Sequence, residues 1–453
     1  MGDLVIAGGT VVTPAGQRRA DLAITDGRIE AIAPDLSRTG EELLDAGGML
    51  LLPGVIDVHT HVRLPDAEQP HRFLQDMLAA AHGGTTTVLT FNNPGTGISA
   101  AGARSLLRGL TEFRERTAGQ SPIDFGLCAV VTGQQADALA ELPALIAAGV
   151  PTFKAFMVYD FALADDALAR VMTTAAEHGG MLQLHCEDPT IIDPLVAAAL
   201  RRGDTGPRHH ALTRPPEAEA AATRAAIDLA RRAGAALYVV HLSSEAALDA
   251  VAEAKERGEP VYAETCPHYL TLTDELYADP DDAQVIRRVI SPPLRSQTDV
   301  DALWAGLRDG VLDVVGSDHV PDRLDIEKRV PAPPFPDISN GAPGIETLLG
   351  VTYARGVGEG RIGIERLVDV LAATPARLFG LPTKGELAVG RDADVVVWDP
   401  SARRTLRQAT LHHTSDFTPY EGMAVSGAAA HVLVGGRPIG ERVGRFIERH
   451  LDA

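Results

Sequence analysis

Six side chains that could take part in binding metal ions occur within or at the ends of short apolar runs. The first run, VIDVHTH, ends in two histidines, and later runs carry a lysine, two more histidines and an aspartate. These residues are His59, His61, Lys154, His185, His241 and Asp318. Imidazole nitrogens and carboxylate oxygens are ligands for zinc and similar divalent ions. The sequence therefore predicts a metal site, provided that the fold brings these runs together.

Two of these positions carry further information. His59 and His61 are two residues apart, so in a strand both side chains point to the same face. Lys154 lies in the apolar run TFKAFM, and burial would lower the pKa of its amine and make it reactive. Reaction with CO₂ would give a carbamate that can bridge two cations. A lysine on an edge strand whose amine reaches solvent is the alternative, and spacing does not decide between them.

The elements that must position these residues are eight apolar runs separated by helical stretches. The runs lie at residues 55–61, 86–92, 125–131, 152–157, 181–187, 236–243, 260–267 and 312–319. Continuous runs of this kind are typical of parallel strands buried on both faces. Eight such strands predict an α/β fold, a (β/α)₈ TIM barrel, whose C-terminal mouth collects the six residues. A doubly wound open sheet is the alternative.

The two ends of the chain have a different sequence pattern from the middle, with short segments rich in β-forming residues separated by glycine-containing turns. Residues 3–45 include the hairpin signal Asp26-Gly27, and similar segments return near the C-terminus. We expect both ends to form one small β domain, which divides the chain into residues 1–52, 53–380 and 381–453. Further helices are predicted at residues 343–358 and 364–378.

Composition limits the classes of partner. The net charge of −20 argues against nucleic acid and anionic membrane surfaces as partners. The cysteines Cys128, Cys186 and Cys266 show no CxxC spacing, which fits a reducing compartment. Apolar runs fall short of the ~20 residues of a membrane-spanning helix, and no signal peptide is recognisable. A cytoplasmic location is expected.

Motifs along nearly the whole chain resemble those of the cyclic amidohydrolases, closest to the dihydropyrimidinase and hydantoinase group. They are PGVIDVHTH (53–61), GVPTFKAFM (149–157) followed by Tyr159, HCED (185–188), TRPPEAEA (213–220), HLSS (241–244), ETCPHYL (264–270), SPPLR (291–295), GSDHVP (316–321), NGAPGIE (340–346) and the later ATPARLFGL and KGELAVGRDADVVVWDP. The resemblance implies a TIM barrel with a β-sandwich made from both termini. It also implies a homotetramer that acts on a small cyclic ureide.

The resemblance further implies a pair of divalent metal ions, expected to be Zn²⁺, held by the six residues named above. Lys154 would be carboxylated at its N6 amine and bridge the ions. A bridging hydroxide would open a 5-substituted hydantoin or a dihydropyrimidine to the N-carbamoyl amino acid, with Asp318 as general base and then acid. Tyr159 would donate to the developing oxyanion.

Two more residues match positions that hold the amide edge of the ring in that group, Ser291 and Asn340. Their alternatives are a strand-end serine and a turn asparagine before a glycine.

Arg63 and Asn93 depart from the hydantoinase pattern. His61-Val62-Arg63 resembles the HxHxR of dihydroorotases, in which the arginine binds the substrate carboxylate, and Asn93 lies near that family's carboxylate-binding asparagine. A dihydroorotase therefore stays an alternative, as does an allantoinase, which shares ETCPHYL and PPLR. Arg63 could instead be an ion-pair partner at the surface. A non-catalytic scaffold protein of the same fold is a remote alternative, since all six ligand positions are retained.

Overall fold

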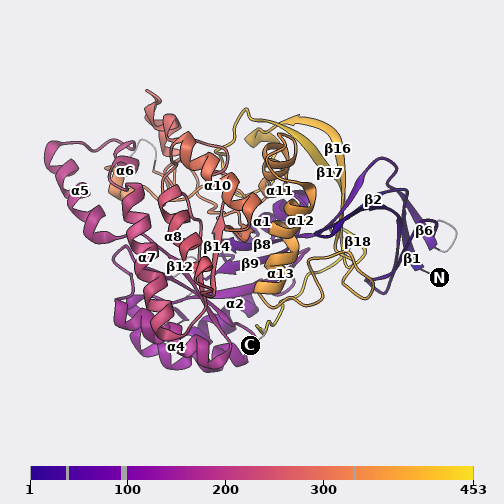
Figure 1. The fold of residues 1–453 in the computed structure, drawn as a ribbon, viewed down its shortest axis with the longest axis horizontal. Coiled ribbons are helices and arrows are strands. Elements are labelled where there is room, and N and C mark those ends of the chain that lie inside the picture. Colours follow the sequence, from indigo (N-terminus) through magenta and orange to yellow (C-terminus); the bar gives the residue numbers. More distant parts are fainter. Residues whose placement is uncertain (1, 37–39, 93–98, 101, 330–332, 452–453) are drawn as a thin grey trace.

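Eight parallel strands form the centre of the molecule in the computed structural model, which describes residues 2–36, 40–92, 99–100, 102–329 and 333–451 (Figure 1). The strands are β8 (Val55–Thr60), β9 (Thr85–Phe91), β10 (Asp124–Val130), β11 (Thr152–Phe156), β12 (Met181–His185), β13 (Leu237–Val239), β14 (Val261–Thr265) and β15 (Val314–Val315). They pair in sequence order, and an isolated parallel bridge from Thr60 to His319 links the last strand's extension to the first. This order confirms the predicted TIM barrel. The alternative prediction, an open doubly wound sheet, is wrong.

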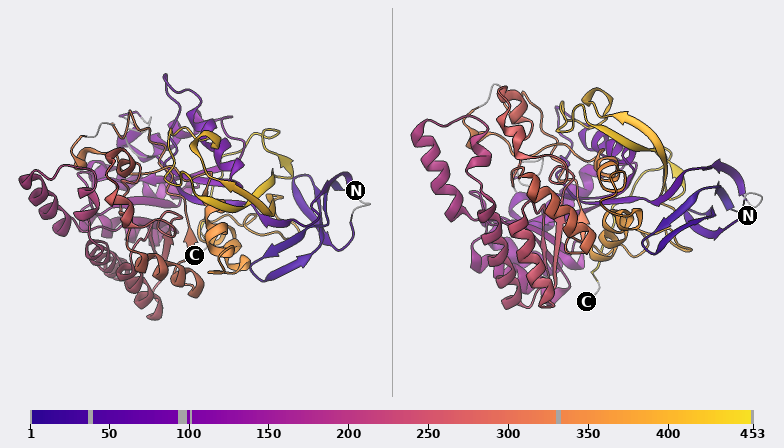
Figure 2. Two further views of the ribbon diagram at one scale, coloured as in Figure 1. Left: turned by 90° about the horizontal axis from the view of Figure 1, so that it is seen from above. Right: turned by 45° about the horizontal axis from the view of Figure 1, so that its top comes forward.

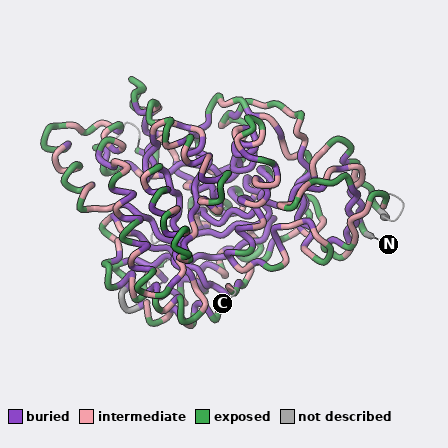
Figure 3. Tube along the Cα trace, in the orientation of Figure 1, coloured by how far each residue is buried: buried purple, intermediate pink, exposed green. Residues whose placement is uncertain are grey.

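Each strand lies within one residue of its predicted run. All residues of β8, β9 and β10 are buried, as expected for strands covered on both faces (Figure 3). The mouth of the barrel is formed by the carboxyl ends of these strands.

Helices surround the barrel, and several of them pack directly against its strands. They are α1 (Arg72–His82), α2 (Leu106–Thr117), α3 (Leu142–Ala147), α4 (Asp165–His178), α5 (Pro189–Arg202), α6 (His209–Leu212), α7 (Pro216–Ala233), α8 (Glu245–Glu256), α9 (Asp282–Ile286), α10 (Gln297–Asp309), α11 (Leu348–Thr352), α12 (Ile364–Val368) and α13 (Thr374–Leu378). In α7 the small residues Ala218, Ala222 and Ala226 are buried at a spacing of four, which lets the helix approach its neighbours closely. The helix ends at Gly234, whose φ of 64° suits a residue without a side chain.

The two predicted C-terminal helices are less regular than expected. The first begins at Leu348, five residues after the predicted start, and continues as a π-helical turn over Tyr353–Val357. The second is α12 and α13 joined by another π-helical turn, Asp369–Ala373.

Two further sheets lie to the right of the barrel in Figure 1, one made of N-terminal strands alone and the other of strands from both ends of the chain. One has the order β5-β4-β1-β6, made of β1 (Gly2–Ala7), β4 (Asp21–Thr25), β5 (Arg28–Ala33) and β6 (Gly40–Asp45). The other has the order β18-β17-β16-β7-β2-β3, made of β2 (Thr10–Thr13), β3 (Gly16–Arg19), β7 (Leu50–Pro53), β16 (Val395–Thr405), β17 (Ala424–Val434) and β18 (Arg437–Pro438). Since β7 pairs with β16, the termini do form a common β unit. The domain limits at 52/53 and 380/381 stay a prediction.

After the terminal sheets, the C-terminal segment runs back to the barrel. The C-terminus therefore lies beside the barrel, far from the N-terminus in the terminal sheets (Figure 2). Arg449 is fully buried there and donates hydrogen bonds to the carbonyls of Leu127 and Phe379 and to the Thr152 hydroxyl. None of the helices in the described part of the chain is long and apolar enough to cross a lipid bilayer.

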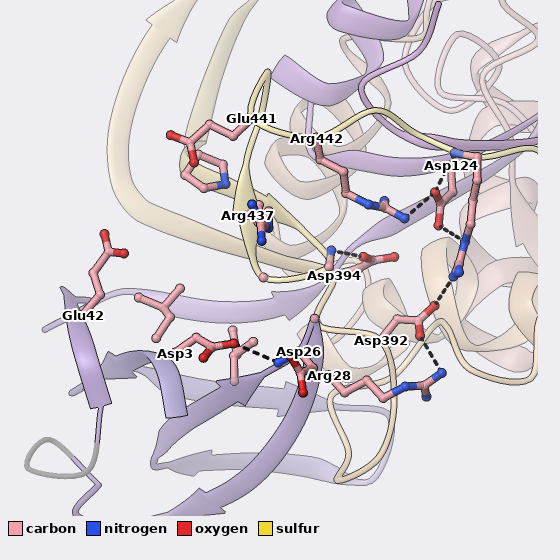
Figure 4. Close-up of a pocket in the computed structure, with 17 residues that line it drawn as sticks. Asp3, Asp26, Arg28, Glu42, Asp124, Asp392, Asp394, Arg437, Glu441 and Arg442 are labelled. Atoms are coloured by element: carbon pink, nitrogen blue, oxygen red, sulfur yellow. Dashed lines mark hydrogen bonds and ion pairs between the residues drawn. The ribbon is translucent and has the colours of Figure 1, made fainter. Parts of the chain in front are cut away.

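A charge network connects the barrel to the terminal sheets, beside a cavity of about 680 Å³ that Figure 4 shows. At its centre, the buried Lys384 ammonium lies 2.9 Å from Asp124 at the start of β10, 3.4 Å from Asp392 and 2.6 Å from Asp394. Arg442 lies 2.9 Å from Asp124 on the other side. Removing the lysine would leave several buried carboxylates short of positive charge.

We therefore predict that Lys384→Met lowers the free energy of unfolding by about 3 kcal/mol, measured by urea denaturation followed by circular dichroism. Lys255→Met is the matched control, because Lys255 is partly exposed and forms its ion pair with a single carboxylate among the described residues, that of Asp313 at 2.7 Å. We expect that control to lose less than about 1 kcal/mol. Equal urea midpoints for Lys384→Met and the wild type would contradict the stabilising role of the network.

Candidate active site

The structure brings the six predicted metal-binding residues together at the mouth of the barrel. His59 lies in β8 and His61 follows it, Lys154 lies in β11, His185 ends β12, and His241 and Asp318 follow β13 and β15. Asp318 Oδ1 lies 3.0 Å from His59 Nε2 and 3.2 Å from His61 Nε2. One ligand atom from each of these three residues lies within 4.8 Å of the others, so the three could hold a metal ion.

The other three residues border this group. The ring centroid of His241 lies 5.3 Å from that of His59 and 4.5 Å from that of His185. The Lys154 ammonium is fully buried, 5.2 Å from the ring centroid of Phe91 and 5.1 Å from that of Phe156. All six residues therefore face one small volume.

Two buried carboxylates orient the histidines. His59 Nδ1–H donates to Glu264 Oε1 at 2.5 Å, and His185 Nε2–H donates to Glu187 Oε2 at 2.7 Å. Glu264 Oε1 also accepts the backbone N–H of His241, at 3.2 Å. A carboxylate on one ring nitrogen fixes the imidazole and leaves its second nitrogen for a metal. Sequence reasoning missed both glutamates, although HCED and ETCPHYL contain them.

The buried polar atoms at the centre of the site show whether these residues are suited to binding a pair of cations. Lys154 Nζ and His241 Nδ1 are both buried and have no hydrogen-bond partner among the described residues. Since buried polar groups are normally paired, these atoms and the mixed imidazole and carboxylate donors fit divalent cations. Burial lowers the pKa of Lys154 to about 8, which increases the fraction of neutral amine able to react with CO₂.

Three site residues adopt backbone conformations that are unusual for residues with side chains. The φ angles are 81° at Tyr159, 38° at His241 and 46° at Asp318. Such conformations cost about 1–3 kcal/mol each and persist where surrounding packing enforces them, commonly at functional sites.

A cavity of about 360 Å³ opens above the six residues. Its lining includes the predicted ring-binding residues Tyr159, Ser291 and Asn340, and the apolar side chains of Phe156, Phe161, Val320 and Ile338. Tyr159, Ser291 and Asn340 thus face the same space. Burial raises the pKa of Tyr159, so the phenol keeps the proton that it could donate.

Tyr159 and His185 are further linked through an arginine that sequence reasoning also missed. Arg214 donates to Glu187 at 2.6 Å, and its guanidinium lies 5.3 Å from the Tyr159 ring centroid. The same cation therefore contacts the carboxylate that orients His185 and the face of the tyrosine.

Arg63 lines the same cavity, but its guanidinium is engaged by protein groups. It lies 2.5 Å from Asp322 and 2.6 Å from Glu327, and donates to the Pro321 carbonyl at 3.1 Å. These contacts match the ion-pair interpretation, while binding of a substrate carboxylate by Arg63 stays a prediction. Asn93 lies outside the described residues.

Comparison with known proteins places the chain in a family. The model of the amidohydrolase family matches residues 50–439. The chain is 40% identical over 445 residues to a D-hydantoinase of Streptomyces coelicolor, covering 96% of this chain and 94% of that protein. It is 39% identical to a D-hydantoinase of Geobacillus stearothermophilus, covering 95% of this chain and 92% of that protein.

Solved structures agree with these sequence matches. The crystal structure of a dihydropyrimidinase from Brevibacillus agri superposes with a TM-score of 0.92 at 38% identity, covering 99% of both chains. An L-hydantoinase (dihydropyrimidinase) from Arthrobacter aurescens gives a TM-score of 0.87 at 29% identity, covering 99% of this chain and 100% of that one. This chain belongs to the amidohydrolase family.

Proposed function

We propose that this protein opens a cyclic ureide by hydrolysis, converting a 5-substituted hydantoin or a dihydropyrimidine to the N-carbamoyl amino acid. The observation that carries the proposal is a cavity lined by five of the six convergent side chains, with His59 directly beneath Asp318, and by Tyr159, Ser291 and Asn340. The names of the relatives, D-hydantoinase and dihydropyrimidinase, support the same class of reaction.

The base of the site would hold two divalent cations, for which we propose Zn²⁺. Their proposed ligands are His59, His61, His185, His241, Asp318 and Lys154 carboxylated at N6. When bound, such ions lower the pKa of water and polarise a carbonyl group.

Asp318 is the proposed general base and acid. Water adds to a ring carbonyl carbon, and the Asp318 carboxylate accepts the proton that the water loses. The ring C–N bond then breaks, and Asp318 delivers the proton to the departing ring nitrogen. The net change is the addition of one water across the amide bond.

The wall of the cavity would bind and polarise the ring. Tyr159 would donate its hydroxyl proton in a hydrogen bond to the carbonyl oxygen as negative charge develops there. Ser291 and Asn340 line the same cavity and would hold the amide edge of the ring. A homotetramer and a cytoplasmic location stay predictions for this chain.

The substrate class is tested with a panel of dihydrouracil, a 5-substituted hydantoin, dihydroorotate and allantoin. We expect the zinc-loaded enzyme to open the first two, because Asp322 and Glu327 already neutralise Arg63 and leave it poorly placed to bind a carboxylate. The rate of ring opening is measured as the decrease in absorbance of the ring. Preference for dihydroorotate or allantoin would contradict the substrate assignment and make Arg63 a specificity residue.

The role of Lys154 is tested by Lys154→Ala. We expect the variant to lose bound metal and to lose activity by at least about 10²-fold, because the bridging group would be missing. Metal content is measured by mass spectrometry of the purified protein. Lys255→Ala is the control and should retain both metal and activity. Full activity in Lys154→Ala would defeat the bridging role.

A further inference from the structure

A third buried lysine, Lys328, lies next to residues that line the substrate cavity and has no part in the proposed chemistry. It is fully buried, and its ammonium donates to the carbonyl of Val289 at 2.8 Å and to that of Ser339 at 2.6 Å. Asp322 Oδ2 lies 3.9 Å away. The lysine therefore connects three separate stretches of the chain at one point.

Two of these stretches carry the proposed ring-binding residues. Val289 lies two residues before Ser291, and Ser339 lies directly before Asn340. The Lys328 ammonium thus holds the backbone of one segment against that of the other.

Gly341 shows how closely the segments approach. Its N–H donates to the same Val289 carbonyl at 3.0 Å, and its φ of 149° suits glycine. A β-carbon at this position would lie 2.5 Å from Val320, which also lines the cavity. The segment therefore fits only when its backbone is placed accurately against its neighbours.

Burying the charged ammonium of Lys328 is energetically unfavourable. Burial lowers its pKa to about 8, and Asp322, the carboxylate that opposes this shift, also pairs with Arg63. An apolar side chain of similar length would fill the same volume without this desolvation penalty. What the lysine adds is a pair of charge-assisted hydrogen bonds to two fixed carbonyls.

We propose that Lys328 is a positioning residue that fixes the spacing between the Ser291 and Asn340 segments and so sets the affinity of the site for the cyclic ureide ring. This inference rests on the proposed function. Because Lys328 touches neither the six residues at the base of the site nor Tyr159 in any described contact, its removal acts on ring binding rather than on the catalytic step.

The test compares Lys328→Met with the control Lys384→Met. Lys384 is also a buried lysine with aspartate partners, but it lies at the junction of the barrel and the terminal sheets. Both are assayed as metal-loaded enzymes at a temperature at which both are folded. For the ring that the wild type opens, we expect Lys328→Met to raise KM at least about tenfold, while kcat stays within about threefold. Metal content stays at the wild-type level, and Lys384→Met keeps the wild-type KM.

Lys328→Gln is a second variant, able to donate to one carbonyl and expected to give an intermediate KM. Hydrogen exchange supplies a readout that does not depend on activity. The segment at residues 338–342, including the Gly341 amide, should exchange faster in Lys328→Met than in the wild type, and at the wild-type rate in Lys384→Met.

Unchanged KM and unchanged exchange in a folded Lys328→Met with full metal content would overturn the inference. Loss of metal together with a fall in kcat would overturn it too, because Lys328 would then support the whole site. If the wild type opens none of the four rings, the proposed function fails, and exchange at residues 338–342 alone decides whether Lys328 holds the two segments together.

Discussion

The burial of Lys154 in the middle of the barrel is the constraint on which the rest of the site depends. A lysine between Phe91 and Phe156, with no hydrogen-bond partner in the described part of the chain, is unfavourable unless its amine is neutral or chemically modified. Four histidines and Asp318 surround it, and Glu264 and Glu187 orient two of the histidines. The proposed cations would account for the burial of so many polar groups in one place.

The parallel barrel makes that concentration possible. Each strand contributes its carboxyl end to one mouth, so residues hundreds of positions apart meet without any local sequence signal. The second requirement is a wall that holds the ring. In the proposed function, the segments around Ser291 and Asn340 supply this wall, and the Lys328 ammonium donates hydrogen bonds to both segments. In the proposed function, the charged residues at the base of the site perform the chemistry, and the residues of the wall determine which ring binds.

Much of this could be predicted from the sequence, and the exceptions have physical causes. Each barrel strand overlaps its predicted run because fully buried strands are continuous apolar runs, although β13 and β15 are shorter than predicted. The π-helical turns at Tyr353–Val357 and Asp369–Ala373 depend on packing and carry no clear signal. The six residues at the base stand out as polar groups in apolar runs. Glu187 and Lys328 resemble ordinary surface charges until the fold buries them. The partners of Arg63 lie about 260 residues away and could not be inferred from spacing.

The most direct test of the central claim is a crystal structure of the purified protein with anomalous diffraction measured on both sides of the zinc absorption edge. The account predicts two metal peaks among His59, His61, His185, His241 and Asp318, with continuous density for a carboxylated Lys154 between them. An unmodified Lys154 amine with no metal peak at the mouth of the barrel, in crystals of active enzyme, would contradict it.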